Sequence, residues 1–336
     1  MSAARPHLAG RPVTVRRGFF WIGVEPSASP AGTVARGQMF VQWEAPPELS
    51  KPYPLVLVHG GGGQGTDWLG TPDGRPGWAT FLVEEGYAVY VVDRPGHGRS
   101  PFHPEVLGPP GGVFTDELVL ALFTAAADGP MSHPTAHLHT QWPGDGGLDD
   151  PNVRQFAAAG PMLADIAVAH GLERERGAEL LDAIGPAVLM THSAGGPMGW
   201  LTADARPELV KGIVAIEPLG PPFLDDPGFG FTLPWGLTAA PMRFDPPAAA
   251  PDELDAKPRA LPNLEKIPIA VIDAEASLFA HQGDASVEFL RQAGCTVDHV
   301  RLAEHGVHGN GHLMMLERNN REALAPILAW LSSSGL

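Results

Sequence analysis

Short runs of apolar residues alternate along this chain with longer segments whose apolar positions follow a helical period. The runs are too short for helices and are rich in Val, Ile and Leu, which is typical of strands buried on both faces of a sheet. The predicted strands are Thr14–Val24, Gln38–Trp43, Leu55–Val58, Ala88–Val92, Ala187–Met190, Gly212–Ile216, Ile267–Ile272 and Val297–Leu302. The predicted helices are Trp78–Glu85, Val153–Ala183 with an interruption near Gly171, Met198–Ala205, Ala285–Ala293 and Leu313–Leu331. This alternation predicts an α/β protein with a mostly parallel central sheet and helices on both of its faces.

Two stretches interrupt the alternation. Residues 101–151 contain three closely spaced histidines and Trp142, and residues 218–266 are rich in proline, which disfavours regular secondary structure. Long irregular segments inside a domain are usually binding loops or lids. We therefore predict one domain over residues 1–336, with an irregular active-site loop at 101–151 and a lid or cap insertion at 218–266.

Composition narrows the classes of function. The formal net charge of −16 argues against nucleic acid, because no cluster of Lys and Arg is present to bind phosphates. The single cysteine, Cys295, allows neither an intrachain disulfide nor a multi-cysteine zinc site. No apolar run reaches the roughly 18 residues of a membrane span. The N-terminal residues lack a signal-peptide pattern, which predicts a cytoplasmic protein, although a secreted form trimmed of its signal would look the same.

A serine follows the predicted strand Ala187–Met190 and precedes a predicted helix. The segment reads Thr191-His-Ser193-Ala-Gly195, close to the Gly-x-Ser-x-Gly pattern of a nucleophile elbow, but with Thr191 in place of the first glycine. In such an elbow, a sharp strand-to-helix turn exposes a serine hydroxyl at the edge of the sheet. Ser193 is therefore the candidate nucleophile.

A glycine-rich loop, His59 to Gly65, follows the predicted strand Leu55–Val58. It lacks the Lys and Ser/Thr of a phosphate-binding loop. Glycines let backbone N–H groups approach a ligand closely, and in hydrolases with a nucleophile elbow such a loop supplies one oxyanion donor. The candidate donors are Gly61 or Gly62, together with Ala194, the residue after the serine.

The next predicted strand ends in Asp93-Arg-Pro-Gly-His-Gly-Arg-Ser100. This segment, His59-Gly60 and His192-Ser193-Ala-Gly-Gly stand in the order and spacing of the α/β-hydrolase superfamily, which the chain resembles over nearly its whole length. The resemblance implies the α/β-hydrolase fold and a catalytic triad in the order Ser, acid, His. It also implies that the loop beginning at Asp93 is chiefly structural.

Three histidines near the C-terminus compete for the role of base: His305, His308 and His312. The base is expected after the last strand and directly before the final helix. His312 has that position, His308 remains an alternative, and His305 is expected on the surface.

The acid is displaced from its usual place in the superfamily. On the strand after the lid, Ser277 occupies the usual Asp position, with Asp273 and Glu275 nearby, whereas Glu217 ends the preceding predicted strand. A glutamate closing an apolar strand requires a partner, because burying an unpaired charge is costly. This arrangement resembles a subfamily of bacterial stereoselective esterases (esterase 713-like) with a Ser–His–Glu triad. Glu217 is therefore the expected acid, with Asp273 or Glu275 as the alternative.

Large apolar residues in the irregular stretches are candidates for a substrate pocket, and they include Trp142, Phe223, Phe229, Phe231, Trp235 and Met242. Of the three histidines of the first stretch, His133, His137 and His139, two are four residues apart, as on one face of a helix. The stretch is flanked by Pro and Gly and shows no helical pattern, so no metal is expected there. We predict that they line the pocket entrance or lie on a solvated loop.

The sequence as a whole predicts a serine carboxylic-ester hydrolase that forms an acyl-enzyme on a small to medium, largely apolar ester and needs no cofactor. The same triad could serve a lactone, an amide or a carbon–carbon bond, because fold and triad do not set the substrate. A non-catalytic ligand-binding protein is the remaining alternative. A homodimer is compatible with the sequence.

Overall fold

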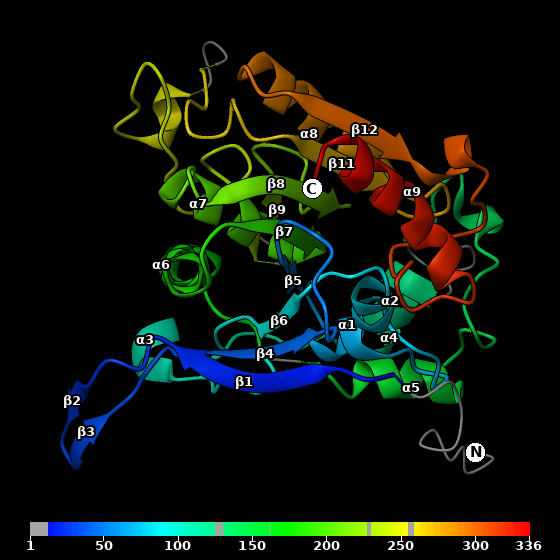
Figure 1. Ribbon diagram of the computed structural model, residues 1–336, viewed down its shortest axis with the longest axis horizontal. Helices are drawn as coiled ribbons and strands as arrows, with labels where there is room; N and C mark the ends of the chain where they lie inside the picture. Colours follow the sequence, from blue (N-terminus) through cyan, green and yellow to red (C-terminus); the bar gives the residue numbers. More distant parts are fainter. Residues whose placement is uncertain (1–12, 125–128, 130, 161, 227–229, 255–258) are drawn as a thin grey trace.

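The computed structural model describes residues 13–124, 129, 131–160, 162–226, 230–254 and 259–336. Its centre is an eight-stranded sheet in the order β1-β4-β6-β5-β7-β8-β11-β12, which runs from bottom to top in Figure 1. The strands are β1 (Arg16–Ile22), β4 (Met39–Ala45), β5 (Leu55–Val58), β6 (Val89–Asp93), β7 (Ala187–His192), β8 (Val210–Ile216), β11 (Ile269–Asp273) and β12 (Val297–Arg301). Every predicted strand of the sheet is present, with bounds that differ by two residues at most.

The sheet is mixed but mostly parallel, as predicted. β1 pairs antiparallel with β4 and β4 antiparallel with β6, whereas all neighbours from β6 to β12 are parallel. Parallel strands place their carboxyl ends at the same edge of the sheet. The segments that follow β5, β7, β8, β11 and β12 therefore converge, and these are the segments that carry the candidate site residues.

Helices cover both faces of the sheet (Figure 1). Leu55 and Leu57 of β5 belong to the core cluster of α2 (Trp78–Glu84) and α9 (Asn320–Ser333). Val56 and Val58 belong to the other cluster, with the helices α6 (Ile166–Ile184), α7 (Gly196–Ala205) and α8 (Ala280–Gln292). Successive residues of a strand point to opposite faces, so this short apolar strand serves both cores.

The final helix begins seven residues later than predicted, at Asn320 instead of Leu313. The guanidinium group of Arg75 donates to the carbonyl oxygens of Leu316, Glu317 and Arg318 at 2.9–3.1 Å. These oxygens would otherwise accept the N–H groups of the next helical turn. Residues 313–319 therefore form turns instead of the first part of the helix.

The interruption predicted near Gly171 is also wrong. α6 runs through Gly171 without a break, and the preceding helix, α5 (Pro151–Ala157), ends well before it. The side chain of Asp165 accepts the N–H groups of Ala167 and Val168 at 3.0 Å and thereby begins α6 as an N-cap.

The two irregular stretches contain only short elements. The first holds α3 (Pro104–Leu107), α4 (Asp116–Val119), a π-helical turn (Leu120–Thr124) and a 3₁₀ turn (Ala136–Leu138). The second holds the small ribbon β9 (Asp225–Asp226) and β10 (Phe231–Thr232), and a 3₁₀ turn (Pro251–Glu253). The elements outside these stretches include the helix α1 (Thr66–Leu69), the hairpin of β2 (Ser27–Ser29) and β3 (Gly32–Val34), and 3₁₀ turns at Ser193–Gly195 and Leu302–His305.

Candidate active site

Ser193 sits in a strained turn between β7 and α7. Its φ of 51° is in the left-handed region, which is costly for a residue with a side chain and is common at functional sites. Two glycines make the turn fit. A Cβ on Gly195 would lie 2.4 Å from the carbonyl oxygen of His59, and one on Gly199 would lie 2.8 Å from the methyl carbon of Thr191. Gly199 thus provides the space that Thr191, the departure from the usual motif, occupies.

The glycine-rich loop packs directly against this turn. A Cβ on Gly60 would lie 2.9 Å from the Cβ of Ser193, and one on Gly61 would lie 3.4 Å from the Cβ of Ala194. Ala194 is near the start of a helical turn, so its N–H has no acceptor within that turn. Gly62 instead turns toward Phe114, with a φ of +73°. Of the two glycines predicted as alternatives, Gly61 is the one that lies beside Ala194.

A buried arginine ties the loop to the turn. Arg94 donates to the carbonyl oxygen of Gly60 at 3.0 Å and to that of Ala194 at 3.2 Å. Its guanidinium also forms an ion pair with Glu173 of α6 at 2.9 Å and lies 3.3 Å from the Nε2 atom of His97. Arg94 and Glu173 are both nearly inaccessible to solvent. One side chain therefore sets the relative position of the two candidate oxyanion segments.

His312 and Glu217 form a buried pair, and the ring centroid of His312 lies 4.5 Å from that of His192. The Nδ1 atom of His312 contacts the Oε2 atom of Glu217, while its Nε2 atom is buried without a partner in the part of the chain that the structure describes. The carbonyl oxygen of His312 lies 3.0 Å from Nε2 of His192, the residue before Ser193. The imidazole of His312 is packed against the rings of Phe123 and Phe279, with centroids 5.5 and 4.2 Å away.

Glu217 follows the last residue of β8 and has a φ of 39°. Its Oε1 atom accepts the N–H of Ala274 at 2.9 Å, and its Oε2 atom accepts the hydroxyl of Ser277 at 2.6 Å. Burial raises the pKa of Glu217, and these two donors oppose the rise by stabilising the carboxylate. Burial lowers the pKa of His312, which leaves its imidazole neutral and able to accept a proton.

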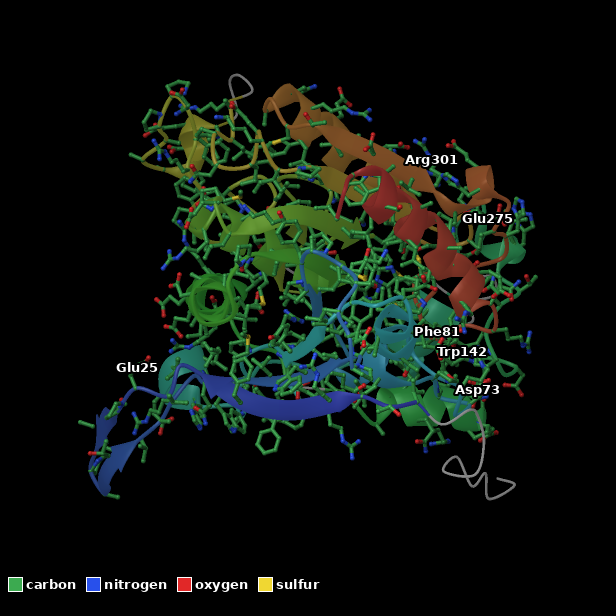
Figure 2. All side chains as sticks on the ribbon, viewed as in Figure 1. Glu25, Asp73, Phe81, Trp142, Glu275 and Arg301 are labelled. Carbon is green, nitrogen blue, oxygen red and sulfur yellow. The ribbon has the colours of Figure 1, made fainter. Side chains whose placement is uncertain are left out.

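The alternative acids and the alternative base pair with other residues. Asp273 is buried against Nε2 of His299 on β12. Glu275, which lies toward the outer edge of the molecule in Figure 2, accepts the N–H of Gly309 at 2.7 Å and lies 3.2 Å from Nδ1 of His308. His308 is exposed. Neither carboxylate contacts His312, so the geometry favours Glu217 and His312 over these alternatives.

The sequence analysis missed a second buried carboxylate, Glu317. It accepts the N–H of Gly311 at 3.0 Å and the side-chain amide of Asn310 at 2.8 Å, and it lies 2.6 Å from Nε2 of His139. These contacts hold the backbone directly before His312. The charge of Glu317 also raises the pKa of His312, in opposition to burial. The sequence does contain a signal for the burial of Glu317. The residue directly follows the apolar run Leu313–Leu316, and a residue next to such a run is expected to be at least partly buried.

His139 is the one histidine of its cluster with a clear structural role. His133 is half-buried and His137 exposed. Within the described residues, no group of three or more His, Cys, Asp or Glu side chains is arranged to hold a metal ion.

A cavity of about 760 Å³ opens beside Gly61 and Ala194. Its walls come from residues between Pro109 and Leu118, between Leu163 and His170, and between Gly230 and Ala239, so both irregular stretches contribute. Most of the lining side chains are apolar. The polar ones are Arg94, His97, Asp165, His170 and Thr232.

Of the aromatic residues predicted to form the pocket, only Phe231 lines this cavity within the described part of the chain. Trp142 is buried in the core on the α2 side, toward Phe81 in Figure 2. There its indole N–H donates to Asp150 at 2.9 Å. Phe223 is 44% exposed and packs on Phe289 of α8. Trp235 and Met242 pack against the core of the α6–α7 face, and Phe229 lies outside the described residues.

Comparison with known proteins identifies a family and two similar proteins. Residues 55–326 match the family described as "Alpha/beta hydrolase family". A fungal protein described as "Probable secreted lipase phiG", from Fungal sp. (strain ATCC 74256), is 39% identical over 345 residues, which cover 96% of this chain and 90% of that protein. The structure reported as "The Atomic Resolution Structure of a Novel Bacterial Esterase" is similar with a TM-score of 0.69 and 25% identity, covering 98% of this chain and 99% of that one.

The fungal relative corrects the predicted location of the protein. The cytoplasmic location expected from the N-terminal sequence is contradicted, because the fungal relative is described as secreted. In the described ranges, every helix is too short or too polar to cross a membrane. Together with the fold and the resemblance to the bacterial esterase, the family match shows that the chain belongs to the alpha/beta hydrolase family and is an enzyme of its esterase and lipase class.

Proposed function

We propose that the protein hydrolyses carboxylic esters through an acyl-enzyme, with Ser193 as nucleophile, His312 as base and Glu217 as the acid of the triad. The observation that carries the proposal is the buried contact between His312 Nδ1 and Glu217. It leaves Nε2 without a partner among the described residues, while the imidazole packs against His192, the residue directly before the strained Ser193. A serine hydroxyl needs such a base, oriented by a third group, to react at neutral pH.

In the first half of the reaction, Ser193 Oγ attacks the ester carbonyl and its proton passes to His312 Nε2. Glu217 keeps the Nδ1 proton of His312 in place and stabilises the imidazolium that forms. The N–H groups of Gly61 and Ala194 bind the oxyanion, and each such donor is worth about 3 kcal/mol in comparable enzymes. When the tetrahedral intermediate collapses, His312 returns the proton to the leaving alcohol oxygen.

In the second half, a water molecule attacks the acyl-enzyme and gives its proton to His312 Nε2. The intermediate collapses, the carboxylic acid leaves, and the proton returns to Ser193 Oγ. No cofactor takes part in any step. The cavity beside Gly61 and Ala194 binds a largely apolar ester of small to medium size, and the proline-rich segment 218–266 acts as its lid. The description of the fungal relative as a lipase supports an apolar, lipid-like substrate.

The test combines labelling with turnover. The purified protein is incubated with an organophosphonate that reacts with activated serines, and the labelled peptide is found by mass spectrometry. We expect the label on Ser193, hydrolysis of 4-nitrophenyl alkanoates, and loss of both in the correctly folded Ser193→Ala variant. Wild-type turnover by that variant, or no label in folded wild-type protein, would overturn the proposal. Matched amides and lactones, hydrolysed faster than the esters, would move the activity to another substrate class.

A further inference from the structure

His170 presents a polar group to the cavity. This residue lies in the first part of α6, is 2% exposed and lines the cavity. Its Nδ1 atom accepts the N–H of Ala239, a residue of the segment 218–266, at 2.9 Å. Burial and the nearby charge of Arg94 lower the pKa of His170 to about 3, so the ring is neutral. Its single proton is therefore on Nε2.

The Nε2–H group of His170 has no hydrogen-bond acceptor among the described residues, and it is not one of the fully buried side-chain atoms that lack a partner. It therefore keeps some accessible surface, and a donor at the wall of a mostly apolar cavity is usually satisfied by a ligand or by water. Two of the other polar side chains around the cavity are already engaged. Asp165 caps α6, and His97 lies between Arg94 and the carbonyl oxygen of Pro95. Thr232 is half-buried on the wall formed by the segment 218–266.

The charges around the cavity favour an uncharged ligand. Arg94 is the only cation among the lining residues of the described chain, and its charge is balanced by the ion pair with Glu173. Both of its terminal nitrogens already donate to backbone oxygens. A carboxylate in this place would therefore be buried without a free counter-charge, which is costly. A neutral oxygen needs only the one donor that His170 provides.

We infer that the cavity selects esters that carry an uncharged hydrogen-bond acceptor, a keto, ether or hydroxyl oxygen, on the chain that enters it, and that His170 Nε2–H donates to this oxygen. The inference rests on the proposed function, because it takes the Gly61–Ala194 side of the cavity as the place of the ester carbonyl. The apolar walls between these two points bind the intervening carbon chain. His170 is thus a specificity-determining residue, with no part in bond breaking.

The test uses matched esters that differ only in one oxygen. One series is 4-nitrophenyl octanoate and its analogues with a ketone at each carbon from 3 to 7. The other is the acetate of octanol and the corresponding oxo-octyl acetates. For one ketone position in one series, we expect kcat/KM to exceed that of the plain ester by about tenfold, the contribution of one hydrogen bond. A chain ending in a carboxylate is expected to react more slowly than the plain ester.

Variants identify the donor. In His170→Asn, the amide oxygen still accepts the N–H of Ala239 but no donor reaches the cavity, so the preference for the ketone should disappear. In His170→Gln, the amide nitrogen reaches farther and should restore part of the preference. Thr232→Val is the matched control and should keep it. For each variant, the preference is the ratio of kcat/KM for the ketone ester to kcat/KM for the plain ester. A smaller fraction of folded enzyme lowers both values equally and does not change this ratio.

Several outcomes would overturn the inference: a wild-type enzyme that hydrolyses plain esters without preferring any ketone, a preference that survives in His170→Asn, one that disappears in Thr232→Val, or faster reaction of the carboxylate. The first of these leaves the proposed function intact. If no ester is hydrolysed at all, the proposed function fails, and the dissociation constants of the same ester pairs for the Ser193→Ala variant decide the inference separately. A tighter Kd for the ketone that depends on His170 would still support it.

Discussion

The hydroxyl of Ser277 donates to the carboxylate of Glu217 at 2.6 Å. Ser277 stands where the superfamily usually carries its catalytic aspartate, on the loop after β11, whereas Glu217 follows the neighbouring strand β8. The residue at the usual aspartate position therefore still belongs to the site, but it now donates a hydrogen bond to the carboxylate of Glu217. This relationship makes the ionisation of Glu217 depend on Ser277, because burial alone would raise its pKa.

Replacing Ser277 by Ala should shift the pH dependence of activity. Loss of the donor disfavours the charged form of Glu217 and raises its pKa further, and the proposed mechanism needs the carboxylate. We therefore expect the acid limb of kcat/KM to move to higher pH, with activity lost first below neutral pH. The pH–rate profile measures this shift. Ser277→Thr keeps the hydroxyl and should keep the profile, and an unchanged acid limb in Ser277→Ala would contradict the prediction.

Two amide substitutions separate the candidate acids. Glu217→Gln should reduce kcat by about 10³–10⁴-fold, as loss of the orienting carboxylate does in related triads. Asp273→Asn should leave kcat much closer to wild type, because Asp273 contacts His299 and makes no contact with His312. Steady-state kinetics measure both effects, with circular dichroism to show that each variant is folded. If Asp273→Asn caused the larger loss, the acid would have to be assigned to β11.

Arg94→Met should affect both stability and catalysis. It leaves Glu173 buried and unpaired, which costs about 3–5 kcal/mol in free energy of unfolding. It also frees the carbonyls of Gly60 and Ala194, so kcat should fall with little change in KM. Urea unfolding and kinetics measure the two effects. In the double variant Arg94→Met/Glu173→Met, much of the stability should return without the activity. A return of both would show that Arg94 does not position the oxyanion donors.

Glu317→Gln should weaken the base. Its negative charge favours the protonated form of His312, so neutralising it lowers the pKa of His312 and stabilises the imidazolium less in the transition state. We expect kcat to fall, but by less than the roughly 10²–10⁴-fold that a general base itself contributes. The comparison variant is Glu304→Gln, an exposed glutamate whose ion pair is with Arg301. Equal kcat values for the two variants would remove Glu317 from any role in positioning or tuning His312.

Thr191 and Gly199 should be energetically coupled. Gly199→Ala places a Cβ 2.8 Å from the methyl carbon of Thr191, so it should cost about 1–3 kcal/mol of stability by overpacking. In a Thr191→Gly background, the same substitution should be tolerated. A double-mutant cycle of unfolding free energies measures the coupling. Additive effects would mean that the space left by Gly199 does not accommodate Thr191.

The sequence was sufficient to predict the sheet, because strands depend on local signals. Apolar runs identify strands such as β5 and β7, and a parallel sheet brings the ends of its strands together. Ser193 and Glu217 follow strands, so their place at this edge of the sheet follows from topology. His312 was expected directly before the final helix, but α9 begins only at Asn320.

The rest of the site depends on side-chain directions that no local pattern encodes. Ser277, Glu317 and Arg94 act through contacts with segments far away in the sequence. The start of α9 was misplaced for the same reason, since Arg75, more than two hundred residues earlier, takes the carbonyl oxygens that a helix would use. Trp142 was placed in the pocket only because it lies in an irregular loop, where periodicity gives no information about burial.

The bonds of Arg94 distinguish two parts of the site. Its guanidinium joins the loop after β5 to the turn after β7, whereas Glu217 and Ser277 are joined across β8 and β11. The two parts meet where His192 contacts the backbone of His312, and where the N–H of Leu219 donates to the carbonyl oxygen of Ser193 at 2.9 Å. An arrangement of this kind allows the acid to migrate between adjacent strands during evolution while the machinery that binds the oxyanion remains unaltered.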